Sequence, residues 1–167
     1  MVDYSFVPQN ISRIQERIQA AAERSGRGFP DIQLLAVTKF HPVEAAIAAH
    51  SCGIRRFGEN RVQEAAGKYT PETMSAMPGS EIDLIGNLQS NKVNKALGLF
   101  DSIQSVDSIG LLETIASRAL ERGKKLKLYL ELHTGEESKS GFSGVDGILG
   151  AIDSYLEILD HRKEEIR

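Results

Sequence analysis

Residues 32–39 read IQLLAVTK, a short apolar run that ends in a threonine and a lysine. A run of this length with no alternation of apolar and polar residues is typical of a strand buried on both faces of a parallel sheet. Pro42 is placed to begin the next helix and Gly53 to end it. The stretch therefore predicts one β-strand and, over residues 43–52, the α-helix that follows it.

The same pattern of a strand followed by a helix repeats along the rest of the chain. An amphipathic helix at 11–25 comes before the first unit, with Asn10 as its N-cap and Gly26 in the left-handed position after its end. Further strands are expected at 54–58, 82–86, 101–106 and 126–133, and further helices at 61–69, 91–98, 109–122 and from Val145 to Leu156. No hairpin signal separates these units, so we expect five β-α units and a parallel α/β sheet.

Two architectures accommodate five such units. One is an open, doubly wound sheet, for which a chain of 167 residues is a natural length. The other is a β/α barrel, which needs eight units and about 200 residues or more. Strand starts near residues 32, 54, 82, 101 and 126 imply that a full barrel would run well past residue 167, so length alone favours the open sheet.

Composition limits the classes of function. The chain has 20 Lys and Arg against 23 Asp and Glu, a net charge of −3, so it lacks the strongly basic character of dedicated nucleic-acid binders. Its one cysteine, Cys52, cannot form an internal disulfide, and its first residues do not resemble a signal peptide. We therefore expect a soluble, cytoplasmic protein with no nucleic-acid or membrane partner. None of the four histidines has a nearby Cys or His at the spacing typical of metal ligands, so no metal site is predicted.

Three residues are candidates for chemistry because each comes at or after the end of a strand. Lys39 could attack a carbonyl carbon, although a solvated lysine just beyond the strand is the simpler interpretation from position alone. Asn60, in the segment GEN, is equally well explained as a helix cap or as a ligand contact. Lys139 lies in a polar loop after the fifth strand. Neither a phosphate-binding P-loop nor a G-x-G-x-x-G motif is present.

Four segments together carry a resemblance that none carries alone. They are LLAVTKFHP (34–42), RRFGENRVQE (55–64), IDLIGNLQSNK (82–92) and ESKSGF (137–142). Their order and placement resemble the pyridoxal phosphate homeostasis proteins, the YggS/PROSC-like family, over residues 8–150. The resemblance implies a (β/α)8 TIM-barrel fold like the N-terminal domain of alanine racemase, of which about five β-α units are present in this chain.

The resemblance also implies a ligand and a role. Pyridoxal 5′-phosphate (PLP) would be held as a Schiff base on Lys39, with Asn60 beside its ring and Lys139 near the ring or its entrance. The family carries the cofactor in intracellular PLP homeostasis without established catalysis, so we expect no catalytic residue. Apo forms of PLP-dependent enzymes are the candidate partners. The alternatives are a racemase-like PLP enzyme and an open-sheet, flavodoxin-like binding domain.

Two departures from the family pattern stand out. His41 occupies the position where relatives usually carry a second lysine. The family's later segments, which include a phosphate-binding turn, have no counterpart in the sequence given. We therefore expect residues 1–167 to form a single PLP-binding barrel domain that is incomplete at its C-terminus. On this expectation PLP binding would be weak and the chain unstable or oligomeric alone.

Overall fold

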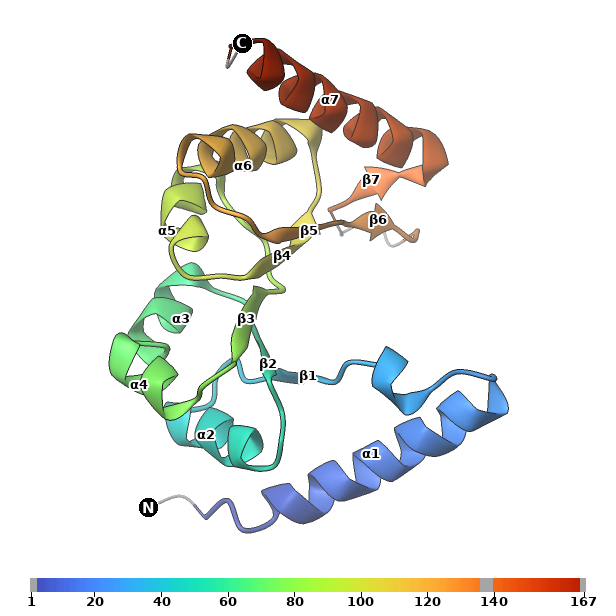
Figure 1. The fold of residues 1–167 in the computed structure, drawn as a ribbon, viewed down its shortest axis with the longest axis vertical. Helices are drawn as coiled ribbons and strands as arrows, with labels where there is room; N and C mark the ends of the chain where they lie inside the picture. Colours follow the sequence, from blue (N-terminus) through green and yellow to red (C-terminus); the bar gives the residue numbers. More distant parts are fainter. Residues whose placement is uncertain (1–2, 136–139, 166–167) are drawn as a thin grey trace.

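A computed structural model describes residues 3–135 and 140–165 (Figure 1). The strands are β1 (Leu35–Val37), β2 (Arg56–Glu59), β3 (Glu81–Leu84), β4 (Ser102–Val106), β5 (Lys127–Leu130), β6 (Leu132–His133) and β7 (Phe142–Ser143). The helices are α1 (Val7–Arg24), α2 (Val43–Ser51), α3 (Val62–Lys68), α4 (Pro71–Ala76), α5 (Val93–Leu97), α6 (Ile109–Glu121) and α7 (Gly144–Glu165), with 3-10 turns η1 (Phe29–Asp31) and η2 (Ser90–Lys92). None of the described helices is long and apolar enough to cross a membrane.

The main sheet has its strands in the order in which they occur in the chain. β1 to β5 lie side by side in sequence, every neighbouring pair is parallel, and β6 pairs with β7 in a separate small sheet. With right-handed crossovers that always advance in one direction, the helices must all fall on one face. Figure 1 shows α2 to α6 along the outer face of a curved sheet.

This strand order decides between the two architectures. A doubly wound sheet reverses its strand order at a switch point so that helices cover both faces. The described sheet has no such reversal and curves as part of a barrel wall does. The parallel sheet and the barrel-type fold are confirmed, and the open-sheet interpretation that length favoured is wrong.

The two faces of the sheet differ in polarity because successive side chains of a strand point to opposite faces. The outer face packs against the helices through fully buried apolar side chains, among them Phe57, Leu84 and Ile103. The inner face carries polar side chains near the start of the strands. At this end of the strands the inner face is therefore linked by hydrogen bonds and ion pairs.

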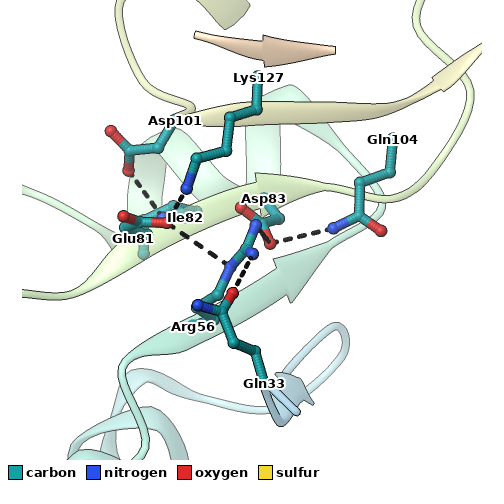
Figure 2. A network of polar contacts seen from close by, with 8 residues as sticks. All are labelled: Gln33, Arg56, Glu81, Ile82, Asp83, Asp101, Gln104 and Lys127. Atoms are coloured by element: carbon teal, nitrogen blue, oxygen red, sulfur yellow. Dashed lines mark hydrogen bonds and ion pairs between the residues drawn. The ribbon is translucent and has the colours of Figure 1, made fainter. Parts of the chain in front are cut away.

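A group of inner-face side chains, the floor network, links strands at their N-terminal ends (Figure 2). The guanidinium of Arg56 donates to Asp83 Oδ2 over 2.6 Å and to Gln33 Oε1 over 2.8 Å. The same Asp83 oxygen accepts from Gln104 over 3.0 Å, and the Asp83 side chain is fully buried. The network consists of Gln33, Arg56, Glu81, Asp83, Gln104 and Lys127.

The first helix begins earlier than predicted. α1 starts at Val7 rather than at residue 11, and Pro8 stands in its first turn, where its missing N–H leaves no donor unsatisfied. Asn10 therefore lies within the helix and does not cap it. The end matches the prediction, because Gly26 has φ = 68° and follows the last turn.

Two further elements differ from the prediction. Between the helix predicted at 61–69 and the strand predicted at 82–86, where no element was predicted, residues 71–76 form α4, with Thr70 Oγ1 accepting from the amide of Thr73 over 3.3 Å at its start. The predicted strand 126–133 is interrupted at Glu131, whose amide donates to Val106 and whose carbonyl accepts from Phe142. The chain therefore leaves β4 after β5 and joins β7 as β6.

Candidate functional site

Lys39 and Asn60 come to the same edge of the sheet, at the carboxyl ends of β1 and β2. The register pairs Val37 with Gly58, and the amide of Thr38 extends the ladder by donating to the Gly58 carbonyl over 3.1 Å. Lys39 and Asn60 each follow two residues after this pair, so both lie just beyond the ends of neighbouring strands. Parallel α/β folds bind ligands at this edge.

The backbone around Lys39 is a tight and strained turn. The amide of His41 donates to the Thr38 carbonyl over 3.1 Å, which closes a four-residue turn with Lys39 and Phe40 at its centre. Phe40 has φ = 63° and is the one non-glycine with a positive φ in the described part of the chain. A turn of this kind favours glycine there, and a bulky residue costs about 1–3 kcal/mol. Such strain persists where surrounding contacts fix it, typically at functional sites.

The side chain of Lys39 is half-buried and close to an aromatic ring. Its Nζ lies 6.0 Å from the centroid of the Phe40 ring. In the part of the chain that the structure describes, no carboxylate forms an ion pair with this amine. No ion pair among the described residues therefore holds this amine in place.

A buried polar group, the strand-end cluster, lies behind the ends of β1 and β2. The Glu59 side chain is fully buried, and its Oε1 accepts from Thr38 Oγ1 and Lys68 Nζ, each over 2.7 Å, and from the Tyr69 hydroxyl over 3.3 Å. The hydroxyls of Thr38 and Tyr69 lie 2.8 Å apart. The cluster consists of Thr38, Glu59, Glu64, Lys68 and Tyr69.

The strand-end cluster holds the Lys39 turn from both sides. Lys68 Nζ donates to the carbonyl of Thr38 over 2.8 Å. The amide of Phe40 donates to Glu64 Oε1 over 2.7 Å, and Glu64 in turn lies 3.6 Å from Lys68 Nζ. Both chain neighbours of Lys39 are thus fixed by charged groups.

The buried hydroxyl of Tyr69 should make the stability of the fold depend on pH in the alkaline range. Burial raises the pKa of the Tyr69 hydroxyl well above its ordinary value. The unfolded chain releases this proton near pH 10, while the folded chain retains it, so the free energy of unfolding should fall as the pH rises above about 10. Urea denaturation at increasing pH should show a smaller fall for Tyr69→Phe than for the wild type. An equal fall in the free energy of unfolding for the two proteins would show that the Tyr69 hydroxyl is not the group responsible.

Asn60 is not a helix cap. The N-cap position of α3 belongs to Arg61, so of the two interpretations left open by the sequence, the cap is wrong. Asn60 is half-buried and borders a pocket of about 360 Å³ between the β2–α3 and β3–η2 loops. The pocket is lined by Asn60, Arg61, Val62, Gln63, Asn87, Leu88, Gln89 and Lys92.

Gly86 sets the backbone position of Asn60. A β-carbon at residue 86 would lie 2.7 Å from the Cα of Asn60 and would also contact its carbonyl oxygen. Ser105 Oγ donates to the Gly86 carbonyl over 2.6 Å, so the loop cannot simply move away. Only glycine allows the two loops to approach this closely.

Gly86→Ala should therefore displace Asn60 and destabilise the fold by about 1–3 kcal/mol, because the new methyl group would clash with the Asn60 backbone. Urea denaturation measures the loss, and Gly67→Ala is the control because a β-carbon there would meet nothing within 4 Å. An unchanged free energy of unfolding in Gly86→Ala would show that the loops are not in close contact.

The comparisons with known proteins agree with this architecture. The family model for the alanine racemase N-terminal domain matches residues 9–159. The chain belongs to this family. Among curated relatives, the pyridoxal phosphate homeostasis protein of Aquifex aeolicus is 38% identical over 134 residues, which cover 80% of this chain and 58% of the relative. The human protein of that name is 38% identical over 136 residues, covering 77% and 50%.

Solved structures similar to this chain give the same result. An unknown protein from Bifidobacterium adolescentis has a TM-score of 0.81 and 35% identity, covering 93% of this chain and 67% of that one. PipY of Synechococcus elongatus, solved with PLP bound, has a TM-score of 0.62 and 41% identity, covering 78% and 58%. Alanine racemase of Clostridium difficile, at 16% identity and a TM-score of 0.63, shares the fold. The chain spans about half to three fifths of the curated relatives described above.

Sequence reasoning found part of this site. Lys39 and Asn60 are brought to one edge, and Lys139 lies outside the described residues. The strand-end cluster was missed, although one signal pointed to it. Lys68 follows Val62 and Ala65 at helical spacing, which places it on the apolar face of α3. A lysine on such a face needs a buried acidic partner, here Glu59.

Proposed function

We propose that this chain binds PLP as a Schiff base on Lys39 and acts in intracellular PLP homeostasis. The observation that carries the proposal is the Lys39 amine, half-buried and free of ion pairs among the described residues, in an anchored turn at the ligand-binding edge. Relatives named for PLP homeostasis and a PLP-bound PipY structure support it.

The residues at the edge fit the cofactor. When bound, PLP supplies an aldehyde carbon that an amine can attack. In this proposal Lys39 provides the amine, and Asn60, which does not cap α3, lies beside the ring of the cofactor. Lys139 is proposed to lie near the ring or its entrance. The close approach of Gly86 to the Asn60 backbone supports the placement of Asn60 by fixing the point from which its side chain extends.

We favour a cofactor carrier over a racemase. The curated relatives are named as homeostasis proteins, whereas the alanine racemase of Clostridium difficile, at 16% identity, resembles this chain in fold alone. A carrier needs only reversible capture of the aldehyde, while a racemase also needs a second group that returns a proton to the opposite face of the substrate. In this proposal the recipients are apo PLP-dependent enzymes in the cytoplasm.

The test is a titration of the purified chain with PLP, followed by visible absorbance. Borohydride should convert the adduct to a stable secondary amine, and tryptic mapping should place it on Lys39. An adduct spread over the exposed lysines would overturn the proposal. Racemisation of L-alanine by the loaded chain would favour the enzyme over the carrier.

A further inference from the structure

We propose that Glu59, Glu64 and Lys68 are positioning residues for the Lys39 amine. They hold the strained turn that presents Lys39, and they do so from behind the sheet without touching a ligand. The ligand in this inference is that of the proposed function, but the ordering of the turn can be measured without it.

The contacts converge on the two residues that flank Lys39. Lys68 binds the Thr38 carbonyl over 2.8 Å, and Glu59 binds the Thr38 hydroxyl over 2.7 Å. On the other side, Glu64 accepts from the Phe40 amide over 2.7 Å. Peptide geometry then leaves Lys39 little freedom in its backbone, whereas its side chain is free to extend toward the ligand-binding edge.

The burial of these charges is hard to explain by stability alone. The Glu59 side chain is fully buried and the Lys68 side chain is 7% exposed, yet no described group hydrogen-bonds Glu59 Oε2. Removing two charges from water often costs more than their mutual attraction returns, and an apolar pair is frequently as stable. A buried pair that contributes little to stability is better explained by the geometry that it imposes.

The backbone geometry of the turn at Lys39 and Phe40 needs such anchors. The left-handed conformation of Phe40 is unfavourable for a phenylalanine, so the turn would relax if its anchors were lost. The hydrogen bond from the Phe40 amide to the Glu64 carboxylate is the anchor at the strained residue itself. Charge-assisted bonds of this kind are about twice as strong as neutral ones.

Glu64→Ala is the sharpest test, because Glu64 is half-buried on a helix and its loss leaves the core intact. Hydrogen exchange of the amides in residues 38–41 should quicken, and the equilibrium constant for the Lys39 adduct with PLP should fall by about tenfold or more, as expected for one charge-assisted hydrogen bond. Glu44→Ala is the control, since Glu44 is exposed and lies in the first turn of α2. The control should match the wild type in both measurements.

A second pair of variants separates positioning from stability. Glu59→Gln combined with Lys68→Met removes both buried charges and leaves neither unpaired. Its control is Arg56→Met combined with Asp83→Asn, which removes a buried ion pair from the opposite end of the same sheet. The first double variant should lose the Lys39 adduct and the slow exchange of residues 38–41 while it remains folded by circular dichroism. The control should keep both.

The outcomes distinguish this inference from the proposed function. Wild-type exchange at residues 38–41 in both Glu64→Ala and the Glu59/Lys68 double variant would overturn the inference, whatever the ligand. Absence of a Lys39 adduct in the wild-type chain would overturn the proposed function, while the exchange data would still decide the inference. An equal loss of adduct in the Arg56/Asp83 control would show that the strand-end cluster acts only through the stability of the fold. That result would overturn the inference.

Discussion

Lys39→Ala is expected to abolish the borohydride-stable adduct with PLP, a loss of at least ~100-fold, while the fold persists. The Lys39 side chain is the only primary amine of the turn, and a half-buried side chain at a strand end contributes little to the core. The measurement is adduct per chain by intact mass, with circular dichroism to confirm folding.

Two further variants make this result specific to the amine. Lys39→Arg keeps the positive charge but not the nucleophile, and it should fail as fully as the alanine variant. Lys127→Ala removes an exposed lysine from the floor network and should react as the wild type does. Full labelling of another lysine in Lys39→Ala would show that the site has been misplaced.

Arg56→Met is expected to destabilise the fold by about 3–5 kcal/mol, because it leaves the fully buried Asp83 carboxylate without its cation. Methionine is close in length to the apolar part of arginine, so the loss comes from the charge rather than from a cavity. Urea denaturation measures the change in the free energy of unfolding. The effect is large against the total stability of a domain, which is typically 5–15 kcal/mol.

The double variant Arg56→Met with Asp83→Asn should recover much of this stability, since no buried charge is then left unpaired. A single variant as stable as the wild type would mean that water reaches Asp83. The Arg56–Asp83 contact drawn in Figure 2 would then not be a buried ion pair.

Much of the fold could be predicted from local sequence patterns, but the order of the strands in the sheet could not. The alternation of apolar runs with helical periodicity predicted five β-α units, each of which the structure contains. Nothing local distinguishes a sheet that advances in one direction from one that reverses, because that choice depends on which strands pair. Resemblance to a family supplied it. α4 was missed because Thr70-Pro71 is as typical of a turn as of a capped helix start.

Site residues that follow a recognisable strand could be predicted from the sequence. Those whose role depends on a partner far away in the chain could not. Lys39 ends a recognisable strand. The role of Asn60 could be assigned only from the structure, because the N-cap of α3 is Arg61, one residue further along the chain. The partner of Arg56 is Asp83, 27 residues away on the neighbouring strand. No propensity rule indicates such a pair.

The sequential order of β1 to β5 has a consequence for how the chain is made. From β2 onward, each strand of the main sheet pairs with the strand synthesised immediately before it, so its first partner is already available when it emerges from the ribosome. Contacts that are close in sequence form quickly, and nascent chains fold from the N-terminus onward. Assembly can therefore keep pace with translation, one β-α unit at a time, with the outer helices closing over each strand as it emerges.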